Sequence, residues 1–483
     1  MIQQYKIIEK RRQNTLTQKL SEEDKIAALN KSMIKVNKIK EQLEKDLPTL
    51  AQQISDCKNL VEPIRKRYQG LLPDDSFFSD LVGENSEEER KVAQDKAPWN
   101  GDKLTELREK LFLEAMNLHK AFVENSPQMR VQLDTFNKMI RGILTKAEMQ
   151  KFSGILFQSF MLVVPVISTT FAAVGSFLKN IGKEEFGLVL IDEAGQAFPQ
   201  SAPGAIWRAK KVIAVGDPLQ IEPVVTIHDT TMEFLKRYFK QTSFIACKET
   251  SVQSLADKAN VYVGSRSIGD KDFFIGSPLL VHGRSQRKIF NIANKIAYNG
   301  KMIYGTEDIE KTVCDWIHVH GQAVNKHFVR AQAEQILPLV KKAFFSEWRA
   351  NGVDSCPSLF IISPFRSVKS GVIRYLRDND YLYRELCQAE DTVNKKVINS
   401  WIYSNIGTVH TFQGREATTV IICLGVDSGS KGQGAIQWAS SKPNILNVAV
   451  TRAKENLYIV GDVSKWANQD YFRDAYKICK EDS

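Results

Sequence analysis

The sequence has no CxxC pair, and its seven cysteines are scattered over 483 residues. An odd number of isolated thiols does not build a disulfide framework and indicates reduced thiols, as in a cytoplasm. The first residues, MIQQYKIIEKRRQ, also lack the apolar core of a secretory signal peptide. We therefore expect a cytoplasmic protein.

A phosphate-binding loop of the form GxxxxGK followed by Ser or Thr is absent as well. The strings NIGKEEF and GDKLTE are the nearest, and both lack its spacing and its hydroxyl. This matters because LVLIDEAGQA, residues 188–197, is an apolar run that ends in the adjacent acids Asp192 and Glu193. Such a pair looks like a Walker B element, in which the Asp holds Mg²⁺ and the Glu polarises the attacking water. A lone acid at a strand end can instead cap a helix.

The length predicts two to four domains, and a hydrophobic content of 43% is ample for buried cores. The formal charge of +10 is compatible with an anionic partner. One uncharged run, residues 152–178, is long enough to span a bilayer. Its Pro165 and its polar residues favour a helix followed by a short buried strand, PVIS at 165–168, so we expect no membrane.

Residues 1–150 have a helical character, with charged residues flanking the apolar ones. An apolar stripe alternates at spacings of three and four, as in a coiled coil, with Lys40 in the missing position. Pro48 is expected to kink or end this helix. A second amphipathic helix is predicted over 103–125. The simplest interpretation is a helical hairpin that packs on its own partner. The stripe consists of Ile26, Leu29, Met33, Val36, Leu43, Leu47 and Leu50.

From residue 160 the pattern changes to short apolar runs that end in polar or glycine corners. They form two groups, at 160–227 and 355–465, with helical segments between the runs. Continuous apolar strands interleaved with helices are typical of parallel sheets covered on both faces. Ligands of such sheets bind beyond the carboxyl ends of the strands, where we expect the polar corners to lie. The sequence therefore predicts an α/β fold with two lobes.

Several of these corners carry side chains suited to phosphate chemistry. The string AVGDPLQIEP is expected to contain the end of a second strand, one crossover helix after the first, that is also followed by an acid, Asp217. Gln220 in the same string is suited to orient a γ-phosphate or a water. In the second group, residues 413–416 precede a strand, and Arg452 is expected on the helix that leads into the last strand. An arginine offered by one lobe to a phosphate held by the other is an arginine finger. A single arginine can equally form a surface ion pair.

Taken in order, these strings resemble the motifs of superfamily 1 helicases, in the branch of the nonsense-mediated-decay helicase and the replication helicase-nucleases. Gly283 stands where the arginine motif usually has an aromatic residue. The matching strings are STTF (168–171, motif Ic), DEAGQ (192–196, motif II), GDPLQIEPV (216–224, motif III), HGRSQ (282–286, the arginine motif), IISPF (361–365, motif IV), GTVHTFQGRE (407–416, motif V) and NVAVTRAK (447–454, motif VI).

The resemblance implies a role for each matched residue. Asp192 would bind Mg²⁺, and Glu193 would activate water. Gln220, Arg284 and Arg452 would sense or clamp the γ-phosphate of ATP. Gln413, Gly414 and Glu416 would contact the nucleotide, with Glu416 facing the ribose. The hydroxyls that would meet a nucleic-acid backbone belong to Thr169, Thr170, Thr408 and Thr411.

The resemblance also implies two RecA-like lobes, the first one incomplete, preceded by the helical insertion. The expected domains are the helical insertion (1–150), the first lobe (151–280), the second lobe (281–470) and a tail (471–483). In the family, motif I lies upstream of such an insertion, so the loop served by the acids is expected on another stretch of polypeptide.

The function expected from the resemblance is that of an ATP-dependent helicase or translocase acting on single-stranded nucleic acid, here without its phosphate loop. A polypeptide carrying that loop would be a partner. Two alternatives remain open: an inactive nucleic-acid-binding fragment or remnant of a helicase gene, and a structural partner that acts through the helical arm.

Overall fold

The computed structural model describes part of the chain. The described residues are 33, 37–38, 40–42, 44–64, 66, 86–95, 101–223, 227–241, 250–268, 271–378, 380–388, 394–427, 429 and 432–481. The chain divides into two compact units, one of residues 1–84 and 95–111, the other of residues 85–94 and 112–483.

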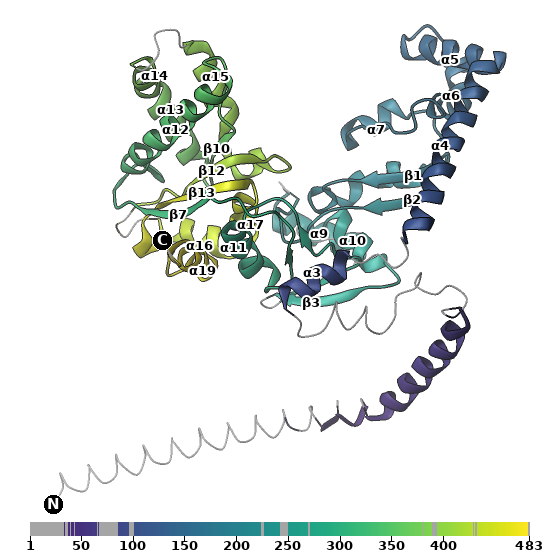
Figure 1. The fold of residues 1–483 in the computed structure, drawn as a ribbon, viewed down its shortest axis with the longest axis horizontal. Helices are drawn as coiled ribbons and strands as arrows, with labels where there is room; N and C mark the ends of the chain where they lie inside the picture. The colour runs from purple at the N-terminus through teal and green to yellow at the C-terminus, as the bar shows by residue number, and fades with distance from the viewer. Residues whose placement is uncertain are drawn as a thin grey trace, which may run out of the picture. The chain divides into compact units, whose positions relative to one another are not determined.

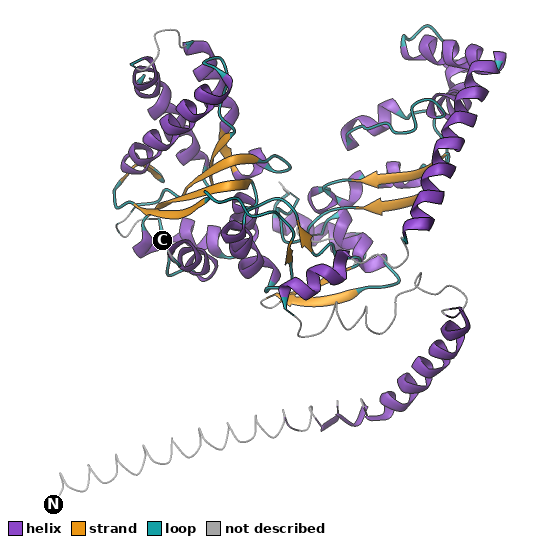
Figure 2. Ribbon diagram, viewed as in Figure 1, coloured by secondary structure: helices purple, strands orange, loops and turns teal. Residues whose placement is uncertain are grey.

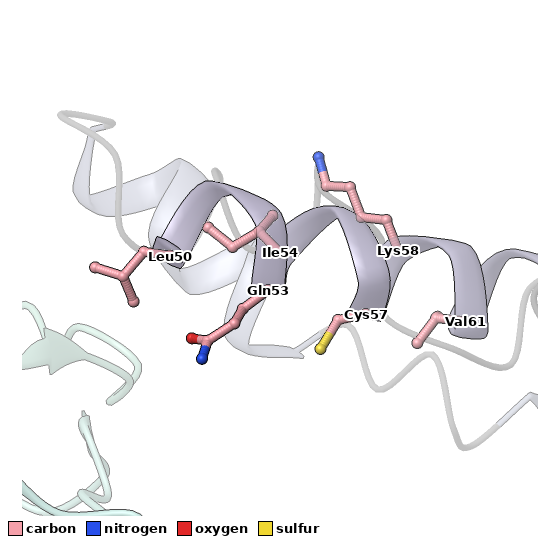
Figure 3. A pocket seen from close by; sticks show the side chains of 6 residues that line it. All are labelled: Leu50, Gln53, Ile54, Cys57, Lys58 and Val61. Carbon is pink, nitrogen blue, oxygen red and sulfur yellow. The ribbon is translucent and has the colours of Figure 1, made fainter. Parts of the chain in front are cut away.

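The described part of the first unit contains a long exposed helix. Residues 44–64 are helical without interruption, so the helix does not end at Pro48. Every described side chain between 33 and 66 is exposed, including Met33, Leu47 and Leu50 of the predicted stripe. Ile26, Leu29, Val36 and Leu43 lie outside the described residues. The coiled-coil pairing therefore stays a prediction. One helix face forms a shallow hollow of about 280 Å³, lined by Leu50, Gln53, Ile54, Cys57, Lys58 and Val61 (Figure 3).

The second predicted amphipathic helix is confirmed as α4 (Asp102–Asn125), which follows the short helix α3 (Glu87–Asp95). No residue of α4 is buried. Leu111 is 71% exposed and Leu118 is 70% exposed. Amphipathic spacing therefore predicted the helix, and the packing of its apolar face stays a prediction.

The first lobe is built around two parallel strands and the helices before them (Figure 2). Phe136, Phe157 and Phe186 pack in one buried cluster that joins the helices to the sheet. Because α5 contributes Phe136 and Met139, the lobe extends upstream of residue 151. Its elements are α5 (Pro127–Ile140), α6 (Lys146–Met161), α7 (Phe171–Phe177), β1 (Phe186–Ile191), α8 (Pro203–Trp207) and β2 (Ala209–Ala214).

The predicted buried strand at 165–168 is wrong. These residues form neither helix nor strand, and Val166 is 77% exposed. An apolar run becomes a strand only where a neighbouring strand pairs with its backbone N–H and C=O groups. Among the described strands, none pairs with residues 165–168. Helix α6 before it begins at Lys146, where Thr145 and Glu148 form a reciprocal capping box.

A further group of elements comes from the segment between β1 and β2 and from the chain after β2. Strands β3 and β4 pair antiparallel, and α10 packs on β4. Ser251 caps α10 through the backbone N–H of Ser254. The elements are η2 (Ala194–Gln196), η3 (Pro199–Ser201), α9 (Asp229–Tyr238), α10 (Val252–Ala259), β3 (Gly264–Ile268) and β4 (Lys271–Ile275).

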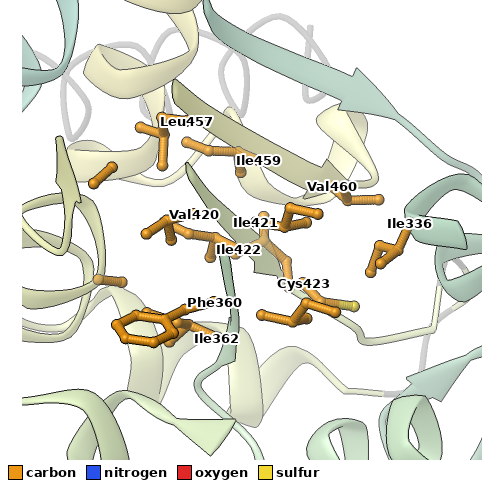
Figure 4. Close-up of a cluster of buried hydrophobic side chains, with 14 of the residues drawn as sticks. Ile336, Phe360, Ile362, Val420, Ile421, Ile422, Cys423, Leu457, Ile459 and Val460 are labelled. Carbon is orange, nitrogen blue, oxygen red and sulfur yellow. The ribbon is translucent and has the colours of Figure 1, made fainter. Parts of the chain in front are cut away.

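The second lobe has a five-stranded sheet in the order β11-β10-β12-β13-β7, and all of its pairs are parallel. Helices α12 (Arg330–Asn351) and α13 (Arg366–Asp378) lie on one face of the sheet. Helices α11 (Arg287–Tyr298), α17 (Asn444–Val450) and α19 (Asp470–Lys480) lie on the other (Figure 1). The central strands carry apolar side chains on both faces, as the apolar runs predicted, and these fill the core (Figure 4). The strands are β7 (Val313–His318), β10 (Leu359–Ser363), β11 (Ile406–Thr408), β12 (Ala417–Cys423) and β13 (Ala453–Gly461).

Short strand pairs and helices complete this lobe. They are β5 (Val281–His282), α11 (Arg287–Tyr298), β6 (Ile303–Tyr304), β8 (Ala323–Asn325), β9 (Phe328–Val329), α12 (Arg330–Asn351), α13 (Arg366–Asp378), α14 (Tyr381–Cys387), α15 (Lys395–Asn405), η4 (Val409–Phe412), α16 (Gln433–Ser440), α17 (Asn444–Val450), α18 (Val463–Trp466) and α19 (Asp470–Lys480).

Helix α19 lies where the sequence suggested a tail. Its Phe472, Ala475 and Cys479 are buried in the second-lobe core, so residues 470–480 belong to the lobe. The apolar face of α19 repeats with a helical period and is covered by α11 and β7. Among the described residues, no helix is long and apolar enough to cross a membrane.

Candidate functional site

The two acids of the first lobe follow β1 directly, as predicted. Asp192 is exposed, and its Oδ1 accepts a hydrogen bond of 2.9 Å from the backbone N–H of Glu193. Glu193 has a left-handed backbone (φ 52°), and its Oε2 accepts a hydrogen bond of 2.6 Å from Gln196 Nε2. A left-handed backbone is uncommon at a non-glycine residue and restricts where its side chain can point. The turn therefore holds the Glu193 carboxylate in one position.

The turn after β2 packs directly against these acids. The Ala194 N–H donates to Val215 O over 2.8 Å. A Cβ atom on Gly216 would lie 2.6 Å from the Gly195 nitrogen, so only glycine allows this approach. Motifs II and III are thus held backbone to backbone at the carboxyl end of the first-lobe sheet.

Gln220 has a defined orientation in this turn. Its Nε2 donates to Asp217 Oδ2 over 3.2 Å, and a carboxylate can only accept. Its Oε1 is buried and has no hydrogen-bond partner among the described residues. A buried acceptor without a donor is costly, which points to a polar group that binds there.

In the second lobe, Glu416 and Arg452 lie side by side at the amino ends of β12 and β13. The Ala417 N–H donates to Arg452 O over 2.9 Å. Glu416 and Arg452 each directly precede a strand, as predicted for residues 413–416. At a carboxyl end of this sheet, the corner acid Asp462 is buried and caps α18. Its carboxylate accepts from Ser464 N–H instead of facing a ligand.

Glu416 is held by two cations. Arg284 Nε lies 2.8 Å from its Oε2, and Lys454 Nζ pairs with its Oε1. The hydrogen bond from Lys454, with the nearby charge of Arg284, holds the pKa of Glu416 below its usual value. The carboxylate is therefore ionised at neutral pH.

Arg452 is buried in the turn between α17 and β13, two residues past the helix on which it was expected. Its guanidinium donates to Val448 O (3.1 Å), Arg415 O (3.1 Å) and Thr451 Oγ1 (3.3 Å). Burial, with repulsion from Arg284, lowers the pKa of Arg452 to about 10, and Glu193 opposes this shift. Arg452 therefore remains charged at neutral pH.

Residues of the two lobes meet at Glu193. A side chain on Gly414 would come within 3.7 Å of Glu193 Oε1, and the charge of Glu193 acts on Arg452. Gln413, beside Gly414, has a buried Nε2 with no hydrogen-bond partner among the described residues. The structure thus brings together the acidic motif of the first lobe and motifs V and VI of the second.

The four threonines come from two places in the chain, one in each lobe. Thr408 ends β11, and its hydroxyl pairs with that of Thr411 over 3.2 Å. Thr169 and Thr170 are exposed just before α7 in the first lobe. They were expected at a strand end, but they follow the irregular residues 162–168.

A cavity of about 730 Å³ opens beside Thr408 in the second lobe. Lys326, Arg366 and His410 line it together with Trp438, which is 53% exposed. Burial and the charge of Arg366 lower the pKa of His410, so at neutral pH the positive charge comes from Lys326 and Arg366. These four side chains were not predicted from the sequence, although Arg366 directly follows the IISPF string and could have been found from that position.

The acids of the first lobe fit a magnesium ion. Mg²⁺ is usually bound by one or two carboxylates together with substrate phosphates, not by a closed protein cage. Asp192 is exposed at a strand end beside Glu193, which matches such a donor set. No group of three or more His, Cys, Asp or Glu residues that could hold a metal occurs in the described part of the chain.

Two known protein families match this chain, one over the helical insertion and the first lobe and the other over the second lobe. An AAA domain family matches residues 2–227, and a second AAA domain family matches residues 277–464. The chain is 23% identical over 324 residues to the ATP-dependent helicase upf1 of Schizosaccharomyces pombe, covering 64% of this chain and 30% of that protein. The chain belongs to the superfamily 1 helicases, in the branch of upf1 and DNA2.

Other relatives of this family support the same placement. Regulator of nonsense transcripts 1 of Caenorhabditis elegans is 25% identical over 296 residues, covering 59% of this chain and 24% of that protein. The DNA replication ATP-dependent helicase/nuclease DNA2 of Gallus gallus is 23% identical over 309 residues, covering 62% and 25%. The chain spans about a quarter to a third of the length of these relatives. Family membership does not favour the two alternatives to a helicase.

Proposed function

We propose that this chain supplies motifs II to VI of an ATP-dependent nucleic-acid helicase or translocase. The observation that carries the proposal is the meeting of Glu193 with Gly414 and with the charge of Arg452, although these residues come from different lobes. In ATP hydrolysis the protein positions the reacting groups and neutralises phosphate charge. Asp192 and Glu193 would position the reacting groups, and Arg452 and Arg284 would neutralise the phosphate charge.

In the proposed site, Asp192 holds the Mg²⁺ that accompanies ATP and that neutralises charge on its phosphates. Glu193 polarises the attacking water. Gln220 is better suited to the water than to a phosphate oxygen, because its Nε2 faces Asp217 and its free Oε1 can only accept a hydrogen. Arg452 and Arg284 stabilise the charge on the γ-phosphate, and Gln413, Gly414 and Glu416 contact the nucleotide.

The phosphate loop is proposed to come from a further polypeptide segment that packs on the first lobe. Parallel sheets are normally covered on both faces. In the sheet of β1 and β2, Leu190 is 63% exposed and Ile213 is 49% exposed. Exposed apolar side chains on a parallel sheet favour a partner that adds a strand and covers them.

The chain by itself is expected to hydrolyse ATP slowly, below about 0.1 s⁻¹, compared with about 10 s⁻¹ for a typical enzyme. The reason is that backbone N–H groups and the lysine of a phosphate loop supply most of the phosphate contacts. Steady-state ATPase assays with single-stranded nucleic acid check this result. Addition of a polypeptide carrying a GxxxxGK(S/T) loop and its strand should raise turnover, and typical turnover without that polypeptide would contradict the proposal.

A single strand of nucleic acid is proposed to bind at Thr169 and Thr170 of the first lobe and at the cavity beside Thr408 of the second. Arg366 and Lys326 would contact phosphates, and the exposed ring of Trp438 offers a surface on which a base can stack. Hydroxyls of this kind position a backbone without reading its sequence.

Strand binding is expected to depend strongly on salt. With the two phosphate contacts from Arg366 and Lys326, affinity should fall about sevenfold between 50 and 200 mM salt, because each contact releases counterions. Fluorescence anisotropy with a labelled oligonucleotide measures this. Arg366→Ala should reduce the salt slope by about 0.7. Lys477→Ala makes the same charge change on α19 outside the cavity and should leave the slope near that of the wild type. Affinity that does not change with salt would count against the proposal.

A further inference from the structure

The two lobes are joined by a partly buried set of hydrogen bonds in which Tyr298, a residue outside the matched motifs, links motif III to motif VI. Tyr298, at the end of α11, donates its hydroxyl hydrogen to Asp217 Oδ2. Asn447 of α17 donates to the Tyr298 hydroxyl oxygen over 3.0 Å and to Leu219 O over 3.1 Å. We call Asp217, Leu219, Tyr298 and Asn447 the interlobe joint.

The direction of each hydrogen bond in the interlobe joint follows from chemistry. A carboxylate and a backbone carbonyl only accept, so Tyr298 donates to Asp217, and Asn447 presents its NH₂ group to Leu219. The Tyr298 oxygen is then free to accept from Asn447. Hydrogen bonds in such a chain polarise one another, and the acceptor at its end is a charged group.

Apolar packing supports the same connection. Leu219 is 5% exposed and Ile221 is 7% exposed, and both belong to the buried cluster that forms the second-lobe core. Asn444 also donates to Gln220 O, and Lys442 Nζ lies 2.7 Å from Glu222 Oε1. The motif III loop of the first lobe is therefore inserted into the second lobe.

The interlobe joint fixes the separation between the two proposed strand-binding places. Asp217 directly follows the Gly216 turn that packs on the acids, while Asn447 lies on the helix that leads to Arg452. If the joint is released, the first-lobe threonines and the second-lobe cavity can move independently. A strand that contacts both sites then loses the benefit of their fixed separation.

We propose that Asp217, Tyr298 and Asn447 are positioning residues that hold the two lobes in register for a single strand that crosses both. This inference rests on the proposed nucleic-acid binding. Because Tyr298 acts through its hydroxyl, removal of that hydroxyl should lower the affinity for strands that contact both lobes. The affinity for strands that contact only one lobe should stay the same.

The test compares Tyr298→Phe with a matched control in the full chain. Tyr304→Phe also removes a Tyr–Asp hydrogen bond, the 2.7 Å contact to Asp308, but both of those residues belong to the second lobe. Hydrogen exchange of residues 216–222 should speed up about 10- to 100-fold in Tyr298→Phe, as expected for loss of a hydrogen bond to a charged group. The control should leave the exchange of this loop unchanged.

The second readout is the ratio of affinities for a 12-nucleotide and a 4-nucleotide oligonucleotide, measured by anisotropy. Tyr298→Phe should lower this ratio by about tenfold or more, while affinity for the short strand stays the same. A general loss of stability would lower both affinities together. Asp217→Asn should have a similar effect, and the double variant should be little worse than either single variant.

Each outcome separates the inference from the function on which it rests. Exchange of residues 216–222 within twofold of the wild type in Tyr298→Phe would overturn the interlobe joint, whether or not strands bind. Faster exchange with an unchanged affinity ratio would overturn its role in positioning the strand. Absence of strand binding by the wild-type chain would instead refute the proposed function, and the exchange measurement would still decide whether the joint exists.

Discussion

Arg452→Ala is expected to reduce ATP turnover by about 10³- to 10⁵-fold when a phosphate-loop polypeptide is supplied, as for other arginine fingers. Arg452 is buried and charged, and its pKa of about 10 lies well above neutral pH. The charge of Glu193 acts on it from the other lobe. We expect the loss to appear in turnover, because the charge acts on the transition state, and steady-state assays measure it.

Arg452→Lys should fail to rescue turnover. The guanidinium uses three of its nitrogens to bond Val448, Arg415 and Thr451, and an ammonium cannot reproduce that planar arrangement. Arg473→Ala is the matched control, because Arg473 forms only an exposed ion pair with Asp470 at 3.3 Å.

These contacts allow a different role for Arg452, since they lie within the second lobe and a buried arginine also supports its fold. Thermal unfolding and strand affinity are therefore measured in parallel. Turnover above a tenth of the wild type, a loss of less than roughly 1.4 kcal/mol, would refute the finger assignment and favour Arg284.

Glu193→Gln is expected to lower turnover in the same complex by about 10²- to 10⁴-fold, the usual contribution of a positioned acid or base. The amide keeps the size of the carboxylate but loses its charge and its ability to polarise water. Steady-state ATPase assays measure the loss, while binding of single strands should stay close to that of the wild type.

Glu184→Gln provides a close control for this variant. Glu184 lies in the same lobe and has the same left-handed backbone (φ 57°), but it forms an exposed ion pair with Lys183 at 3.2 Å. Its replacement should leave turnover unchanged. If Glu193→Gln behaved like Glu184→Gln, another group would have to polarise the water.

The sequence alone was sufficient for those features that depend on neighbours along the chain. Continuous apolar runs predicted β1, β2, β10, β12 and β13. In β10, β12 and β13 the apolar side chains at successive positions are covered on both faces of the sheet. Amphipathic spacing predicted α4. The order of the motifs identified the family, since each motif is a short local string.

Packing could not be predicted in the same way. The run PVIS has the composition of a strand, yet it has no described strand beside it. The apolar face of α4 has a helical period, yet it is exposed. Conversely, residues 470–480 form a core helix because α11 and β7 cover its apolar face. A residue pattern states what a segment can bury, and only the other segments decide whether it is buried.

The site was decided in part by contacts between distant residues. Asp192, Glu193 and Gln220 were predicted from the strands they follow, but the link from Tyr298 to Asp217 spans 81 residues and that from Asn447 to Leu219 spans 228. Arg452 was named from its motif, whereas its burial depends on the carbonyl of Arg415 in another loop. Local strings determine which chemical groups are present; the tertiary fold determines which groups meet, because hydrogen bonds require separations near 3 Å that sequence spacing does not specify.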